Sequence, residues 1–418
     1  MICSPIRLFL YTVFLLALVV KVVLMHHPKT VLDALSHCHY VDICVLFLKK
    51  KGMSLKMKKE IIDSLTGIRG IAAIYVVIYH LFHHASDNNF INNGYLSVDL
   101  FFILSGFIIT HAHRNDFFDV VTKKNYITFM LSRVMRIWPA YVFWLLFNIA
   151  IIALKGRPIS FDQIVSNVLM IQNMGLSSSI IGTGWSLSVE FFAYFFFPFI
   201  CIFTMSKNAY KSLYIFLLSV CVIMLVAFVR HSFIIGSQIK FSGPLDVMSF
   251  DGFGALLRGL SEFCMGVVGY KIYIYAKNTS LKYVNHLTYA ITFILIASLL
   301  SSGMDVLFSA STFVLIPLLA MGNNKIVSFL SSQFSVFLGK ISFSLYLCHI
   351  PLVFYIYSRA ELLLSNIIGH ELFLLVACGA ISISACIFIA WVSYELIEKK
   401  LRIYINIKMF NSKRIAKI

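Results

Sequence analysis

Charged residues are scarce in this sequence. Asp, Glu, Lys and Arg make up 13% of the 418 residues, whereas hydrophobic residues make up 60%. A typical soluble domain carries about 25% charged residues. The composition therefore excludes a large soluble domain and predicts a polytopic membrane protein.

The sequence also lacks cysteines at the spacings that are typical of metal sites or disulfide frameworks. The nine cysteines form no CxxC pair, and most lie within apolar runs. The sequence HxxHH at residues 80–84 places histidines at helical spacing, but no carboxylate follows at a matching position. We therefore expect neither a disulfide framework nor a metal site.

Acidic residues are outnumbered by basic ones, and the net charge is +17. Such an excess could suggest a nucleic-acid partner, but the positive charges lie in short loops and tails. Charge of this kind sets the orientation of a membrane protein. Nucleic acid is therefore not an expected partner, and the lipid bilayer is.

The apolar segments predict an all-α bundle of about ten transmembrane helices. If the basic run 49–60 lies in the cytoplasm, the other segments rich in Lys and Arg, mainly 111–136 and 396–418, lie there too. The outer loops carry few positive charges, as the positive-inside rule requires. Both ends of the domain are then cytoplasmic. The expected spans are 65–84, 95–112, 137–154, 185–204, 211–229, 254–275, 286–302, 306–321, 341–358 and 375–395.

Three regions are expected along the chain. Residues 1–52 form an N-terminal extension, which is a leader, an extra helix or a mis-assigned start before Met53. Residues 53–398 form the ten-helix domain. Residues 399–418 form a short basic tail that suits the anionic cytoplasmic leaflet.

The first span carries two cationic or titratable side chains on one face. The run from Ile71 to Tyr79 has no charge, and Arg69 precedes it while His80 follows it. Eleven residues are close to three helical turns, so Arg69 and His80 share a face roughly 16 Å apart along the axis. This arrangement suits a long ligand with an anionic head at the membrane surface and a reactive end inside. The alternative is a snorkelling anchor and a histidine that packs between helices.

Several carboxylates fall inside expected spans. Asp99 lies in the first turns of the second span, where it either caps the helix or orients a histidine. Glu190 lies within an aromatic helix without a neighbouring cation, which favours a functional role. Glu262 follows Arg258 at i,i+4 spacing, and we expect this pair to be structural.

Two arginines stand at the cytoplasmic start of the third span. Arg133 and Arg136 are three residues apart and project from one side of a helix. Guanidinium groups match phosphate oxygens, so the pair predicts a phosphate clamp. The alternative is ordinary positive-inside anchoring. Trp138 and Pro139 are expected at the interface and in the first turn of the span.

Two further side chains are candidates for substrate binding. Trp185 opens the fourth span, and His349 lies within the ninth, two residues before a proline that can loosen the helix at membrane depth. Glu395 at the end of the last span is expected to pair with Lys399 or Arg402.

Five motifs follow one another along the chain: TGIRGIAAIYVVIYH, YLSVDLFFILSGFIIT, SRVMRIWP, GWSLSVEFFAYF and ISFSLYLCHIPL. In this order they resemble the membrane acyltransferase type 3 family, which modifies bacterial surface polysaccharides and related sugars. Together the motifs are specific, and the resemblance covers about residues 60–398.

The resemblance implies an enzyme of the bacterial inner membrane. Acetyl-CoA, or another acyl-CoA, would be the donor, and a hydroxyl of a glycan or glycolipid would be the acceptor. The family's R-x10-H falls on Arg69 and His80, its R-x-x-R on Arg133 and Arg136, and its membrane glutamate on Glu190. Some members carry a C-terminal esterase-like domain, which is not expected here, so this chain would complete the transfer itself or rely on a separate protein.

A mechanism follows as a hypothesis. His80, with an ordinary pKa near 6.5, is the best available general base for a sugar hydroxyl. Asp99 or Glu190 would orient it, and the arginines would bind the coenzyme A phosphates. Direct transfer and an acylated His80 both remain open. A proton-coupled secondary transporter is the alternative function, but its usual internal repeat is not visible in this sequence.

Overall fold

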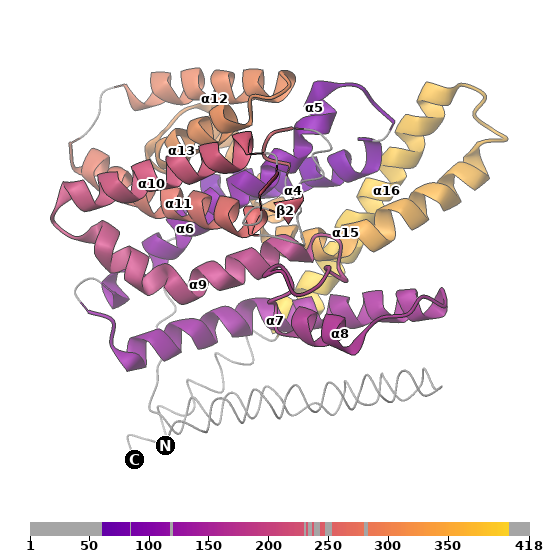
Figure 1. Ribbon diagram of the computed structural model, residues 1–418. Helices are drawn as coiled ribbons and strands as arrows, with labels where there is room; N and C mark the ends of the chain where they lie inside the picture. The colour runs from indigo at the N-terminus through magenta and orange to yellow at the C-terminus, as the bar shows by residue number, and fades with distance from the viewer. Residues whose placement is uncertain are drawn as a thin grey trace, which may run out of the picture.

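The computed structural model describes residues 61–400, except 84, 118–119, 230, 233–235, 238–242, 247–252 and 280–282. The expected N-terminal extension and nearly all of the basic tail lie outside the described residues. Each expected span corresponds to a helix (Figure 1). These helices are α4 (Asp63–Phe82), α6 (Ser97–His113), α7 (Lys123–Leu154), α9 (Gly184–Met205), α10 (Ala209–Phe228), α11 (Gly254–Thr279), α12 (Val284–Leu300), α13 (Asp305–Met321), α15 (Gln333–Leu364) and α16 (Glu371–Ser393).

Short elements connect the long helices. The described residues also include one antiparallel pair of two-residue strands. The short elements are α5 (Asn89–Asn92), the 3-10 turns η1 (Asn93–Leu96) and η2 (Arg114–Asp116), α8 (Phe161–Val168), β1 (His231–Ser232), β2 (Gly236–Ser237), α14 (Lys325–Leu330) and the π-helical turn η3 (Tyr394–Lys399). In η3 the predicted pair of Glu395 with Lys399 is confirmed, at 2.7 Å.

Seven stretches in the described part of the chain are long and apolar enough to cross a membrane. They contain α4, α6, α7, α9, α10, α15 and α16. Helices α12 and α13 are apolar but have only 17 residues each. Helix α11 has 26 residues, and its charged side chains, among them Arg258 and Glu262, lower its hydropathy. The all-helical membrane architecture is thus present.

Helix α7 begins fourteen residues before the expected start of the third span, at Lys123 rather than at 137. The hydroxyl of Thr122 accepts from the backbone N–H of Asn125 at 3.2 Å and caps this earlier end. Pro139 therefore lies inside the helix, and its expected place in the first turn is wrong. The segment before Pro139 stays helical because it packs inward, as buried Phe129 shows.

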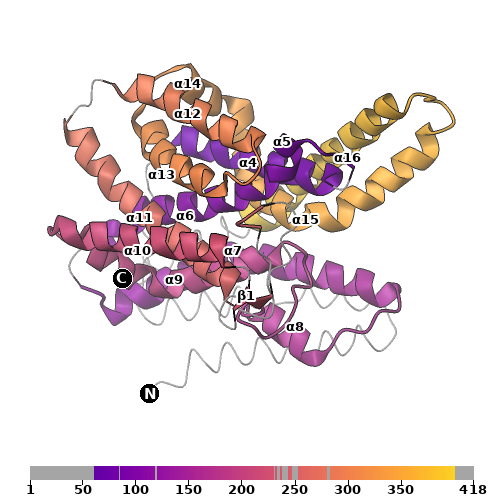
Figure 2. The same cartoon turned by 45° about the horizontal axis from the view of Figure 1, so that its top comes forward.

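The helices group into two packed sets. Helix α15 lies along both α4 and α16, while α11 lies along α6, α9 and α10. Figure 2 shows α12, α13 and α14 gathered at one side of the bundle, and α15 and α16 leaving as a pair on the other. The pairing of α4 with α15 brings residues that are about 270 positions apart into contact.

Helices α4 and α15 approach closely at two glycines. A Cβ on Gly70 would lie 2.7 Å from the Cβ of Leu338, and a Cβ on Gly339 would collide with the carbonyl of Thr66. Only glycine allows this distance between the two backbones. The close approach sets the register in which α15 side chains meet those of α4.

Replacement of Gly339 by alanine is expected to destabilise the protein. The added methyl group must push α15 away from α4, and overpacking of this kind costs about 1–3 kcal/mol. Thermal unfolding in detergent should show a lower midpoint. Gly369→Ala is the matched control, because a Cβ at Gly369 meets no atom within 4 Å. Equal midpoints for the two variants would contradict the close packing.

Candidate active site

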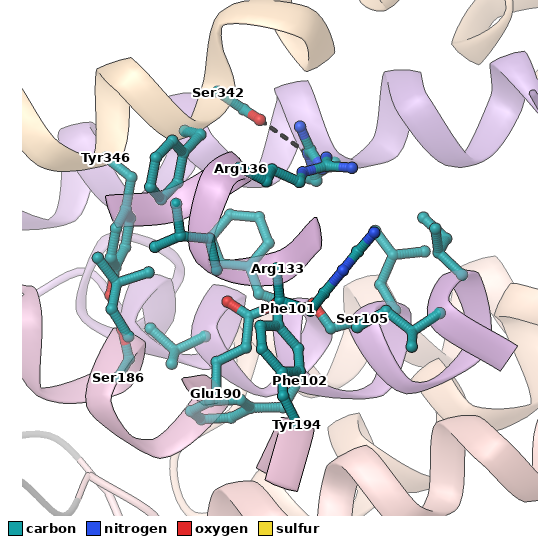
Figure 3. A pocket seen from close by; sticks show the side chains of 18 residues that line it. Phe101, Phe102, Ser105, Arg133, Arg136, Ser186, Glu190, Tyr194, Ser342 and Tyr346 are labelled. Atoms are coloured by element: carbon teal, nitrogen blue, oxygen red, sulfur yellow. Dashed lines mark hydrogen bonds between the residues drawn. The ribbon is translucent and has the colours of Figure 1, made fainter. Parts of the chain in front are cut away.

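A cavity of about 870 Å³, open mouth included, lies between five of the long helices. Helices α4, α6, α7, α9 and α15 each contribute side chains to its wall. Figure 3 shows these side chains turned toward a common space. Those that carry polar groups are Arg69, Ser105, Arg133, Arg136, Ser186, Glu190, Tyr194, Ser342 and Tyr346.

Three arginines from two helices line the cavity. Arg69 of α4 donates from Nε to the Ser342 hydroxyl at 2.8 Å and from Nη2 to the Gly339 carbonyl at 3.0 Å. Arg136 of α7 is exposed and close enough to repel the charge of Arg69. Arg133 of α7 lies 3.3 Å from His113, measured from Nη2 to Nε2. The arginines that were expected to bind an anion therefore line one cavity.

Glu190 lies in the same cavity as the arginines. Its Oε1 accepts from the Ser105 hydroxyl and from the Tyr194 hydroxyl, both at 2.6 Å. Arg69 is among the cations that it attracts. One hydrogen bond from α6 and one from α9 fix this carboxylate in the wall. It is thus a preorganised polar group of the cavity, and no hydrogen bond joins it to His80 among the described residues.

His80 faces another histidine rather than a carboxylate. Its Nδ1 lies 3.0 Å from the Val76 carbonyl oxygen and 3.3 Å from Nε2 of His349. The centroids of the two imidazole rings are 5.0 Å apart. His349 is fully buried, and His80 is half-buried. The pairing of α4 with α15 thus brings together two of the residues singled out in the sequence.

Tyr346 connects the cavity to the histidine pair. It lines the cavity, and its ring centroid lies 5.9 Å from that of His349, one helical turn further along α15. Its hydroxyl is 2.7 Å from that of Ser186, and the ring of Phe101 meets it edge-on. The cavity wall and His349 therefore share helix α15, and His349 in turn contacts His80 of α4, although neither histidine lines the cavity itself.

Asp99 does not orient His80 in the structure. It forms a buried, bidentate ion pair with Arg258 of α11, in which Nε donates at 2.8 Å to one carboxylate oxygen and Nη2 donates to the other. The expected pairing of Arg258 with Glu262 is thus corrected, since Glu262 accepts from Ser309 at 3.0 Å. The i,i+4 spacing permitted a pair on one helix, but the carboxylate across the α6–α11 contact offers both oxygens to the guanidinium fork.

Trp185 packs against Arg258 of this ion pair and does not line the cavity. Its ring lies 5.9 Å from Cζ of Arg258, and the side chain is 5% exposed. It packs with Phe102 and Val189 in a buried cluster. Substrate binding by Trp185 stays a prediction that this position does not favour.

Removal of one member of the Asp99–Arg258 pair is expected to destabilise the fold. Asp99→Asn or Arg258→Met leaves one charge buried without its partner, at a cost of about 3–5 kcal/mol. The double variant removes both charges and should lose less than the sum of the two single variants. Thermal unfolding of the four purified proteins gives the coupling. Additive losses would show that the pair does not act as a unit.

Most of the smaller polar residues of the cavity were not predicted from the sequence. Ser342, Tyr346 and His349 stand at positions i, i+4 and i+7 of α15, so they share one face of an otherwise apolar helix. That spacing predicts a polar face on α15 and can be recognised in the sequence alone. Ser105 and Tyr194 carry no such pattern. Within the described ranges, no three His, Cys, Asp or Glu side chains lie close enough to hold a metal ion.

The sequence was also compared with known proteins. The model of a family described as an acyltransferase domain matches residues 62–391. A protein of Staphylococcus aureus (strain COL) with the name "Putative O-acetyltransferase" is 25% identical over 333 residues, which cover 74% of this chain and 54% of that protein. The O-acetyltransferase OatA of Staphylococcus aureus (strain NCTC 8325 / PS 47) is 25% identical over 323 residues, which cover 71% and 51%. The chain thus spans about half the length of these curated relatives. No solved structure matches the chain.

Proposed function

The chain belongs to the acyltransferase domain family, and we propose that it transfers an acyl group from acyl-CoA to a sugar hydroxyl of a surface polysaccharide, lipopolysaccharide or related glycan. We take the acyl group to be acetyl, because the relatives are named O-acetyltransferases. The observation that carries the proposal is a cavity lined by three arginines, whose wall residue Tyr346 packs beside His349, the partner of His80.

The polar groups of the cavity suit an acyl-CoA molecule. Coenzyme A is anionic at its phosphates, and guanidinium groups bind phosphates through paired hydrogen bonds. Arg69, Arg133 and Arg136 would hold that end. The pantetheine arm carries amide and hydroxyl groups on an apolar chain, so it would lie along Phe101 and find a hydrogen-bond acceptor in Glu190. The thioester would then approach Tyr346.

The transfer step needs a base and a group that stabilises an oxyanion. The acceptor hydroxyl attacks the carbonyl carbon of the thioester, so that a C–O bond forms and the C–S bond breaks. His80 Nε2 takes the proton of the hydroxyl and returns it to the sulfur of coenzyme A. The Tyr346 hydroxyl, which lies 2.7 Å from that of Ser186, would turn from Ser186 and donate to the thioester oxygen. If the group passes through an acylated enzyme instead, the same nitrogen is the nucleophile.

The topology belongs to the proposal as well. Ten crossings require that α11, α12 and α13 traverse the bilayer in addition to the seven longer stretches. An even number of crossings leaves both ends of the domain on one side, and the basic segments favour the cytoplasm. The enzyme would then lie in the bacterial inner membrane, with its arginines at the side from which acyl-CoA arrives.

Mass spectrometry of surface glycans tests the function. Cells that express the protein should carry glycans heavier by one acetyl group than cells without the gene. Cells that express the His80→Gln variant at the same level should resemble cells without the gene. Identical glycans in all three strains, with a confirmed acceptor glycan present, would reject the proposal.

A further inference from the structure

Two histidines from distant parts of the chain make a defined hydrogen-bonded pair. His349 is 269 positions from His80, yet its Nε2 lies 3.3 Å from Nδ1 of His80. The opposite nitrogen of His349, Nδ1, lies 3.1 Å and 3.0 Å from the carbonyl oxygens of Leu345 and Tyr346. Both nitrogens of His349 and Nδ1 of His80 therefore have a defined hydrogen-bond partner.

These neighbours decide where the hydrogens lie. Carbonyl oxygens only accept, so Nδ1 of His349 must carry a hydrogen, and in the neutral ring Nε2 is then an acceptor. Nδ1 of His80 faces this acceptor and the Val76 carbonyl, so it also carries its hydrogen. The remaining nitrogen of His80, Nε2, makes no hydrogen bond to any residue that the structure describes. Its lone pair is the one available to a substrate.

We propose that His349 is the positioning residue of His80. Nε2 of His349 accepts a hydrogen bond from Nδ1 of His80, and this bond fixes the His80 ring with the lone pair of its own Nε2 directed to the substrate. This inference rests on the proposed function, since it assigns His80 the role of base or nucleophile. When Nε2 of His80 takes the proton of the acceptor hydroxyl, the ring becomes a cation. The bond from Nδ1–H to His349 then becomes a charge-assisted hydrogen bond and strengthens.

The other residues that could have served this purpose are engaged elsewhere. Asp99 is paired with Arg258, and Glu190 accepts from Ser105 and Tyr194. A neutral histidine also suits a buried site between helices, because a carboxylate at this place would need a further cation. His349 therefore does here what the buried aspartate does for the histidine base of a Ser-His-Asp triad.

Steady-state kinetics of His349 variants test the proposal. His349→Met keeps the volume but removes the acceptor, so kcat should fall about 10- to 100-fold while the KM for acyl-CoA stays nearly constant. His349→Gln should recover part of the loss, because its amide oxygen can take the place of Nε2. His349→Asn is the matched control, since its amide is too short to reach His80, and it should stay as slow as His349→Met.

The His80→Gln background separates a positioning role from a structural one. If His349 acts through His80, His349→Met should cause no further loss of residual activity when His80 is already glutamine. An equal fold-loss in both backgrounds, or a wild-type kcat for His349→Met, would overturn the proposal. If His349→Met does not fold, as thermal unfolding will show, equal rates for the Gln and Asn variants would overturn it instead. A fully active His80→Gln protein would instead overturn the role of His80, which belongs to the proposed function.

Discussion

A protein in which His80 is replaced by glutamine is expected to bind acyl-CoA normally and to lose its turnover. Loss of a general base costs about 10²–10⁴-fold in rate. Glutamine keeps the approximate volume and the hydrogen bonding of the side chain, but it cannot accept a proton at neutral pH. Because the base acts only after the donor is in place, kcat should fall while the affinity for acyl-CoA remains. Initial rates of acetyl transfer and equilibrium binding of acyl-CoA measure the two effects separately.

His83→Gln is the matched control for this variant. His83 is the C-cap residue of α4, three residues after His80, and its Nδ1 faces the Tyr79 carbonyl at 2.9 Å, just as His80 faces Val76. Its replacement changes the same type of residue in the same local environment, and activity should persist. If the two variants retain similar activity, His80 packs between helices and has no chemical role.

Loss of Arg136 is expected to weaken the binding of acyl-CoA about ten- to a hundredfold. A hydrogen bond to a charged group contributes about 1.5–3 kcal/mol, and each 1.4 kcal/mol is a factor of ten. Arg136 is exposed at the cavity, and its guanidinium group makes no hydrogen bond with the described residues, so Arg136→Ala should leave the fold intact. The KM for acyl-CoA should rise and the KM for the acceptor should not. Lysine should restore binding only in part, because it lacks the planar fork.

The neighbouring cations sharpen this prediction. Lys123→Ala removes an exposed charge from the first turn of α7, outside the cavity, and controls for the general surface potential. Arg69→Ala should affect both binding and stability, because Arg69 also joins α4 to Ser342 and Gly339 of α15. If Arg136→Ala and Lys123→Ala give the same KM for acyl-CoA, the arginines serve only to orient the protein in the membrane.

Much of the fold could be predicted because apolar runs and loop charges carry the information. All ten expected segments are helical, although α7 and α15 start earlier than hydropathy indicated, at Lys123 and Gln333. The extra turns are held by packing, as buried Phe129 and Leu338 show, and not by an apolar run. Span lengths therefore locate helices well and helix starts poorly.

The site could be predicted in its parts but not in its pairings. Arg69 and His80 lie on one face of α4, as their spacing indicated, and both contact α15. Arg133 and Arg136 likewise lie on one face of α7. The partners of Asp99 and His80 come from α11 and α15, which no local pattern in a single sequence connects with them. Glu262 shows the same limit, since its expected partner Arg258 is bound to a carboxylate of another helix.

Transfer of labelled acetyl groups in proteoliposomes tests the central claim most directly. Purified protein would be reconstituted with a glycan acceptor inside the vesicles, and acetyl-CoA labelled in its acetyl group would be added outside. We predict that the label becomes attached to the glycan, that free coenzyme A appears in equal amount, and that His80→Gln vesicles show neither. Unmodified glycan and intact acetyl-CoA, together with uptake of a solute driven by a proton gradient, would contradict the account and identify a transporter.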